Sequence, residues 1–223
     1  MKALKRWFDR RGALPLTCYL AAALLWVVLG AVHWGSDALA RSGGMLYEAE
    51  IPVTDWQLAG LETEESTAET AVLTTTNGDP QMILEDVSDM VVRTLSYTVE
   101  FEGDAREMCL YYTTKVGEDY SQDRRVFPEA LGDGKYLYTL PRTSIVALRL
   151  DPCSPDENKT VEMTFTPGTI SLNESETLPA VWQYFVPSWY QAFCLVLYPA
   201  LAAAACSWLR AVVRALRQRK KAR

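Results

Sequence analysis

Two long apolar runs near the ends of the chain dominate its hydrophobic pattern. The first lies within residues 14–34 and the second within 186–209, and neither contains Asp, Glu, Lys or Arg. A helix of about 20 residues crosses the hydrocarbon core of a bilayer. Trp34, Trp189 and Trp208 stand near the ends of these runs, where membrane proteins carry aromatic belts. The pattern therefore predicts transmembrane helices at 14–34 and 186–209.

Between the two runs, short segments alternate apolar and polar side chains. Leu95, Tyr97, Val99 and Phe101 form the clearest row, and such alternation is typical of a half-buried strand. Further strands are expected within 108–112, 146–150 and 161–166 and, from weaker patterns, within 47–53, 56–61, 71–75, 81–84, 135–140 and 169–172. Turn residues separate these segments, and the acidic stretch 62–70 is expected to be a loop. The fold class predicted for residues 35–185 is an antiparallel β-sandwich or jelly roll.

Charge is distributed unevenly and orients the predicted spans. Residues 1–11 hold five bases and one acid, 210–223 hold seven bases and no acid, and 35–187 hold ten bases against 27 acids. Basic flanks stay on the cytoplasmic side of a membrane. We therefore expect a two-pass plasma-membrane protein with cytoplasmic basic tails at 1–13 and 210–223. The central domain, 35–185, is expected to be extracytoplasmic.

The first apolar run has a second interpretation, as a cleaved signal peptide. Its flank is basic, and Ala38-Leu39-Ala40 resembles an A-x-A cleavage site. The run is longer than the 7–15 apolar residues usual in signal peptides, which favours a retained anchor. In both cases the central domain lies outside.

Composition argues against catalysis. The only histidine, His33, falls at the predicted membrane border, and the chain has no G-x-S-x-G motif. The outer domain therefore has no histidine that could act as the general base of a Ser-His or Cys-His catalytic pair. Adjacent carboxylates are interpreted as a solvated acidic surface. We expect a non-enzymatic protein with no cofactor and no metal, and no nucleic-acid partner, because its bases gather at the ends.

Cysteines and sequons leave alternatives open. Cys109 and Cys153 are the only cysteines of the predicted outer domain, so either a disulfide or two separate thiols fits the sequence. Asn158 and Asn173 begin N-x-S/T sequons that are expected to face outward. They matter only in a eukaryotic secretory pathway, and the favoured alternative is that they occur by chance.

Tyr120 is the strongest candidate for a sugar-binding platform. Its neighbours are polar, which suits an exposed loop, and Arg124 and Arg125 follow closely as hydrogen-bond donors. Because the outer domain is acidic, a neutral glycan fits better than an anionic polymer. The alternative is that the tyrosines of this region pack the edges of the sandwich.

Several segments in order give the central region a resemblance to a known group. They are Asn77–Gln81, Cys109–Tyr112, Asp119–Gln122, Ser144–Pro152 (SIVALRLDP) and Val161–Phe165. Over roughly residues 75–175 the chain resembles the extracytoplasmic β-sandwich modules, similar to carbohydrate-binding jelly rolls, of bacterial envelope polysaccharide and glycosyltransferase membrane proteins. In those proteins the module follows the first transmembrane helix. A transferase unit is not expected here, and no functional residue carries over from the resemblance.

The sequence thus supports two hypotheses about function. The first is an accessory protein in envelope polysaccharide assembly, which binds glycan or docks to a membrane glycosyltransferase. The second is a protein-interaction or sensing module that acts through a partner membrane protein.

Overall fold

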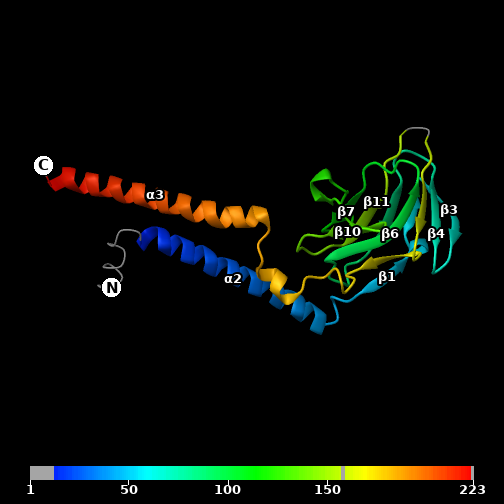
Figure 1. The fold of residues 1–223 in the computed structure, drawn as a ribbon, viewed down its shortest axis with the longest axis horizontal. Helices are drawn as coiled ribbons and strands as arrows, with labels where there is room; N and C mark the ends of the chain where they lie inside the picture. The colour runs from blue at the N-terminus through cyan, green and yellow to red at the C-terminus, as the bar shows by residue number, and fades with distance from the viewer. Residues whose placement is uncertain (1–12, 157–158, 222–223) are drawn as a thin grey trace. The chain divides into compact units, whose positions relative to one another are not determined.

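The computed structural model describes residues 13–156 and 159–221, which form two compact units. One unit contains the apolar helices, up to Ser36 and again from Pro179. The other, Asp37–Leu178, is built from strands. Figure 1 shows the helices and the strands that make up these units, coloured by residue number.

The helical unit contains the two predicted apolar helices, both of which are longer than expected. Helix α2 runs over Ala13–Ser42, a 3₁₀ turn η3 over Val181–Phe185 and helix α3 over Trp189–Lys221. Both long helices are apolar and long enough to cross a membrane by length and composition. Their large apolar side chains are mostly exposed in the structure.

Two side-chain hydrogen bonds join the helical segments. The Trp26 indole donates to the Phe185 carbonyl at 2.9 Å, and the Tyr19 hydroxyl donates to the Val196 carbonyl at 3.0 Å. Pro199 lies inside α3 and lacks the N–H that would donate to the Leu195 carbonyl, so the Tyr19 contact falls next to the interrupted position. Gly30 permits close approach, because a Cβ there would lie 2.7 Å from the Phe185 ring.

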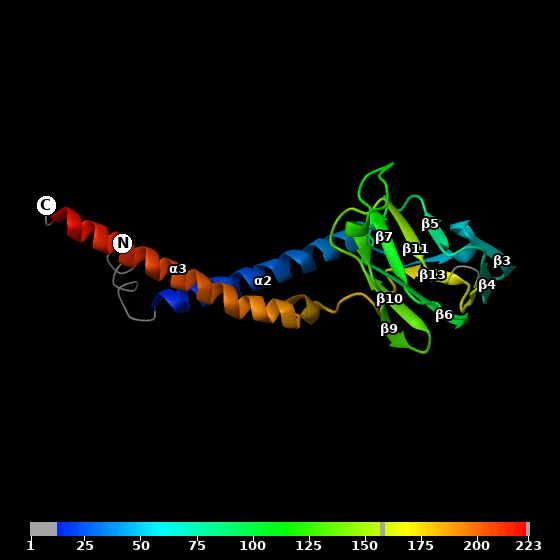
Figure 2. The same cartoon turned by 90° about the horizontal axis from the view of Figure 1, so that it is seen from above.

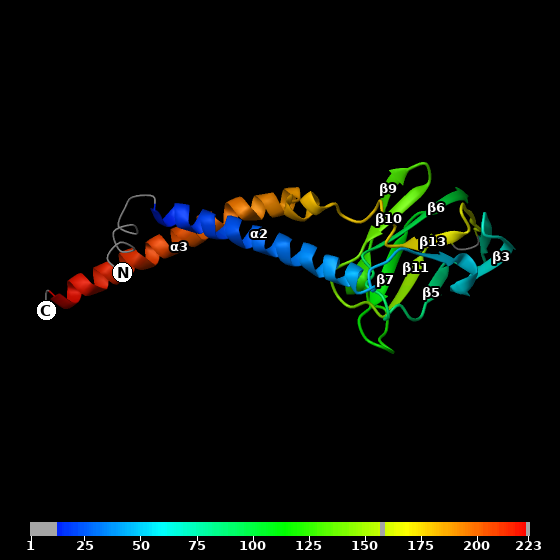
Figure 3. The same cartoon turned by 90° about the horizontal axis from the view of Figure 1, so that it is seen from below.

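The β unit consists of two antiparallel sheets, which confirms the predicted sandwich. The larger sheet contains β1 (Ala49–Pro52), β13 (Thr169–Leu172), β6 (Thr94–Glu102), β12 (Glu162–Phe165), β4 (Ala71–Thr75), β3 (Leu61–Ser66), β10 (Lys135–Thr139) and β9 (Glu129–Gly132). The smaller has the order β2 (Gln57–Ala59), β5 (Gln81–Leu84), β11 (Ala147–Asp151), β7 (Cys109–Thr113) and β8 (Arg125–Val126). Figure 2 shows β5, β11 and β7 side by side, and Figure 3 shows the β9–β10 hairpin beside β6.

The core lies between the inner faces of the two sheets. Alternation along each strand sends every second side chain inward. Leu148 and Leu150 of β11 are fully buried, as are Leu110 of β7 and Phe165 of β12. These are the apolar positions of the alternating segments, so the sequence pattern correctly identified the inward faces.

The expectation of a loop at 62–70 is wrong for its first half. β3 pairs with β4 there, with a register shift between Thr63 and Glu65. Only Leu61 of this strand is buried, because β3 is a sheet edge whose later side chains all face water. An edge strand of this kind shows no alternation, and its acidic side chains discourage further strand pairing.

The expectation that Asn173 faces outward is also wrong. Its side chain is fully buried and its φ is 55°. The amide oxygen accepts from the backbone N–H of Arg93 at 2.7 Å, and its nitrogen donates to the carbonyls of Tyr47 and Val91. This asparagine therefore joins three segments of the domain and is not accessible for glycosylation. Asn158, the other sequon asparagine, lies outside the described residues.

Candidate ligand-binding site

One register row crosses the outer face of all five strands of the smaller sheet. Gln57 pairs with Ile83, Ile83 with Arg149, Arg149 with Tyr111, and Tyr111 with Arg125. Neighbouring strands lie about 4.8 Å apart, so the row extends over roughly 19 Å. Its members alternate along their strands with apolar residues of the core or packed against it, such as Met82, Leu110 and Leu148, which places them on the outer face. We call these five residues the outer row.

Arg149 occupies the centre of the outer row and is held rigidly. Its Nε and Nη2 donate to the two carboxylate oxygens of Asp151, each at 2.7 Å. Its guanidinium lies 4.9 Å from the centre of the Tyr111 ring and 6.0 Å from that of Tyr120. The Asp151 hydrogen bonds raise the pKa of Arg149, whereas burial raises the pKa of Asp151 despite that ion pair. The result is a fixed planar cation between two aromatic rings.

The structure places Tyr120 beside the outer row, although it is less exposed than expected. The residue is half-buried, and its hydroxyl donates to the Leu148 carbonyl at 3.3 Å. Burial raises its pKa. Close by, the Gln122 amide donates to the Tyr111 hydroxyl at 3.1 Å. The hydroxyl end of Tyr120 therefore packs against the sheet, and the ring is not a fully exposed platform.

Arg124 and Arg125 point to different partners. Arg124 forms an ion pair with Glu118, which also accepts from the backbone N–H of Thr114 at 2.9 Å. The hydrogen bond from Arg124, followed by that from Thr114, lowers the pKa of Glu118 to about 2. Arg125 pairs with Glu107 at 3.3 Å and lies 4.8 Å from the centre of the exposed Phe127 ring. Of the three expected residues, Arg125 belongs to the outer row, Tyr120 adjoins it, and Arg124 braces a neighbouring loop.

A cleft of about 560 Å³ opens next to the outer row. Gln57 and Ile83 of the row line it together with Tyr120, and the loop around Lys115 and Glu118 forms a wall. Two further carboxylates, Glu85 and Asp86, also line it, so its charged groups are mainly acidic. Hydrogen bonds from Ser88 lower the pKa of Asp86. The cleft thus offers carboxylate and amide acceptors beside the cation and rings of the row.

Cys109 and Cys153 are both buried free thiols in this structure. Burial raises the pKa of both, and that of Cys153 reaches about 12. Neither is therefore a reactive thiolate at neutral pH. The disulfide between them stays a prediction. Within the described residues, no group of three or more His, Cys, Asp or Glu is arranged to hold a metal ion.

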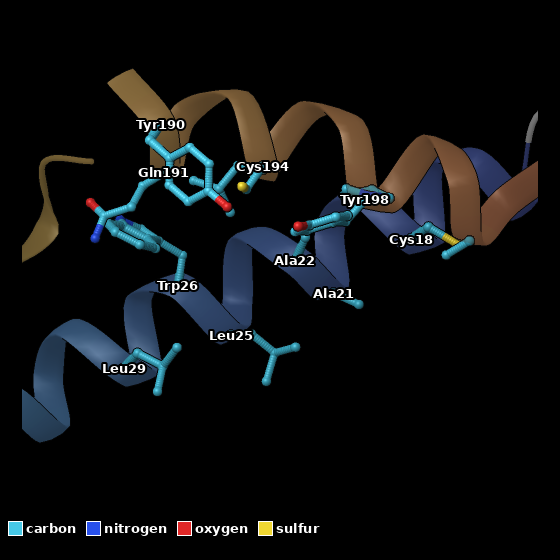
Figure 4. Close-up of a pocket in the computed structure, with 13 residues that line it drawn as sticks. Cys18, Ala21, Ala22, Leu25, Trp26, Leu29, Tyr190, Gln191, Cys194 and Tyr198 are labelled. Carbon is cyan, nitrogen blue, oxygen red and sulfur yellow. The ribbon is translucent and has the colours of Figure 1, made fainter. Parts of the chain in front are cut away.

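A second hollow, of about 600 Å³, lies between the two helices of the helical unit (Figure 4). Trp26 and Tyr190 meet at one end, and Ala22 lies near Tyr198 further along. None of the side chains that line it is charged. A mainly apolar hollow of this kind suits a hydrocarbon environment.

Sequence reasoning missed the centre of the site. Tyr111 and Arg149 lie on predicted strands and occupy the positions opposite to the core leucines. An arginine at an outward strand position was the available signal. The local sequence pattern does not predict the strand order, which aligns these two residues with Gln57, Ile83 and Arg125.

No protein-family model matches the chain, and no curated protein matches its sequence. Several solved structures share its fold in part. A CBM86 xylan-binding module from Roseburia intestinalis is 11% identical, with a TM-score of 0.39 over 56% of this chain and 94% of the module. A family 29 carbohydrate-binding module is 7% identical, with a TM-score of 0.41 over 60% of this chain and 98% of the module. The C-terminal family 6 module of a laminarinase from Zobellia galactanivorans is 9% identical, with a TM-score of 0.38 over 57% of this chain and 100% of the module. Similarity at this level does not indicate what the chain binds.

Proposed function

We propose that this chain is a membrane-anchored, non-enzymatic protein whose β unit binds a neutral glycan across the outer row. The observation that carries the proposal is the alignment of Arg149, Tyr111 and Arg125 in one register row. Sugar rings present apolar C–H faces that pack on aromatic rings, and hydroxyls that pair with planar polar groups. The row is about 19 Å long, which suits an extended chain. Gln57 is exposed and Arg149 and Arg125 are half-buried, whereas Tyr111 is only 6% exposed.

The charge of the domain supports a neutral ligand. Residues 35–187 carry ten bases and 27 acids, so a polyanion would be repelled at distances within the screening length of roughly 8 Å. Arg149, Arg124 and Arg125 are each paired with a carboxylate. The site therefore has directed donors but little net positive charge.

Anchoring in the membrane is supported by the two helices. Exposed apolar side chains cover both α2 and α3. In water they would form a large apolar surface, which is unfavourable. The basic flanks put both termini in the cytoplasm, so the β unit faces outward. In this arrangement the protein serves as an accessory component of envelope polysaccharide assembly, holding glycan near a membrane glycosyltransferase or another membrane partner.

A protein-interaction role is the second candidate, and one observation favours it. Val116 is 90% exposed on the loop beside the cleft, and Phe127 is 54% exposed beside Arg125. Exposed apolar side chains near a polar site are typical of protein interfaces. A β unit that binds no neutral glycan but retains a membrane protein through Val116 would support this role.

Calorimetric titration of the fragment 37–178 tests the glycan proposal. We expect a neutral polysaccharide to bind and a polyanionic one not to bind. Arg125→Ala should weaken binding about ten-fold, because a hydrogen bond from a charged group is lost. The matched control is Glu100→Gln, an exposed change on the larger sheet, which should leave Kd unchanged. Equal loss in both variants would contradict the assignment of the site.

A further inference from the structure

The end of α3 carries a basic segment that the glycan site does not use. The helix runs over Trp189–Lys221, 33 residues, of which about 20 are needed to cross the hydrocarbon core. Counted from Trp189, that length ends near Leu209, directly before Arg210. The remaining twelve or so residues continue as helix for roughly 18 Å.

Basic and apolar side chains occupy neighbouring faces of this segment. Arg210, Arg214 and Arg217 recur at helical spacing and share one face. Leu209 and Leu216 recur at the same spacing on the next face, and they are 53% and 55% exposed. Residues 210–223 contain seven bases and no acid. The segment is therefore a strongly cationic continuation of an apolar helix, with Arg210, Arg214 and Arg217 on one face.

We infer that the segment from Arg210 to Arg219 binds the anionic lipid headgroups of the leaflet from which α3 emerges. The inference rests on the membrane anchoring proposed above. A layer of headgroups about 5–7 Å thick follows the hydrocarbon core. A rise of 1.5 Å per residue places Arg210 and Arg214 within or at the edge of that layer.

Charge favours lipid over the other occupants. A second copy of the chain would bring an equally cationic segment and be repelled. An acidic protein would satisfy the charge but would leave the segment's position directly after the span unexplained. Clusters of four to eight bases at this position are typical of anionic-lipid binding, and each base near the surface contributes on the order of five-fold to affinity.

Lipid retention by the full-length protein tests the inference. The protein is reconstituted in vesicles of equal phosphatidylglycerol and phosphatidylcholine, extracted in mild detergent, and its retained lipids are quantified by mass spectrometry. We expect the ratio of retained phosphatidylglycerol to retained phosphatidylcholine to be at least five at low salt, against a ratio of one in the bulk lipid. Enrichment should fall toward unity at 1 M salt, where the screening length is about 3 Å.

Variants separate charge from structure. Arg214→Gln with Arg217→Gln should reduce the enrichment at least five-fold, whereas Arg214→Lys with Arg217→Lys should retain it. Arg106→Gln, which removes an exposed base of the β unit away from the glycan site, is the control and should have no effect. A lipid ratio equal to bulk, or one that the Gln pair leaves unchanged, would overturn the inference, as would an acidic protein that displaces the lipids. Release of the protein from vesicles by alkaline carbonate would instead refute the membrane anchoring itself.

Discussion

At the scale of single residues, Arg149 illustrates how the site depends on its neighbours. Its donors are aligned by Asp151, and its flat face lies against Tyr111. A guanidinium held on both sides loses little conformational entropy when a ligand binds. Removing Asp151 would therefore disturb the orientation of Arg149 as well as a buried ion pair.

Two substitutions at Tyr120 separate the contribution of its ring from that of its hydroxyl. Tyr120→Phe removes only the 3.3 Å hydrogen bond to the Leu148 carbonyl, so the free energy of unfolding should fall by about 1 kcal/mol and glycan affinity should persist. Tyr120→Ala removes a half-buried ring and should lower both stability and affinity. Urea unfolding and calorimetric titration of the fragment 37–178 measure the two effects. A Phe variant that fails to bind would show that the hydroxyl contacts the ligand.

Asn173 is the residue whose replacement should cost the most stability among polar positions. Asn173→Ala removes the hydrogen bonds to Arg93, Tyr47 and Val91 and places alanine at a φ of 55°. We expect a loss of about 3 kcal/mol or more in the free energy of unfolding, from buried unpaired backbone groups and from strain. Denaturant titration measures it.

Asp133 provides the matched control for this prediction. It also has a positive φ, 49°, but lies exposed in the turn between β9 and β10. Asp133→Ala should lower stability by no more than about 1 kcal/mol, because it places alanine at a similar φ while no buried group loses a partner. Equal losses at both positions would mean that backbone conformation alone, and not the amide network, sets the effect.

At the scale of elements, the wall of the cleft should be sensitive to acid. Arg124 and Thr114 hold the pKa of Glu118 at about 2, below its usual 4.5. A carboxyl whose pKa is lowered in the folded state stabilises it above the unfolded value. The stability difference between wild type and Glu118→Gln should therefore be constant above pH 4.5 and decline as the pH falls toward 2. Thermal unfolding at a series of pH values measures it, and a difference independent of pH would contradict the ion pair.

The last turns of α2 belong to the β unit rather than to a linker. Asp37 is 2% exposed and accepts from Arg93 Nε at 3.0 Å and from Arg142 at 2.9 and 2.6 Å. A fragment that starts at residue 45 leaves these arginines without that carboxylate. We expect it to be less stable than 37–178 by on the order of 3 kcal/mol. Equal denaturation midpoints for the two fragments would show that the contact contributes nothing.

The elements also show why sequence reasoning succeeded in the core and failed at the edges. β4, β5 and β13 match their expected ranges because buried strands alternate or are continuously apolar. β3, β8 and β9 were missed because edge strands are short or exposed on both faces. The outer row depends on strand order and register, which long-range pairing decides and which no local pattern records.

At the scale of the whole molecule, the acidic outer domain and the basic ends define the expected orientation. Protease added outside intact cells should digest the β unit and leave the C-terminal tail protected, because flanking bases remain in the cytoplasm. Immunoblotting with an epitope at each end measures this. Loss of the C-terminal epitope would contradict the orientation. A mature protein that begins at Arg41 would show that the first helix is a cleaved signal peptide.

The central claim, that the outer row binds a neutral glycan, is tested most directly by locating the ligand on the β unit. Backbone amide resonances of the fragment 37–178 would be followed by NMR while a neutral oligosaccharide is added. The account predicts saturable shifts at Gln57, Ile83, Tyr111, Arg125 and Arg149, one from each strand of the smaller sheet, with few shifts in β4 and β12. Shifts confined to the larger sheet, or none with any neutral glycan, would contradict it.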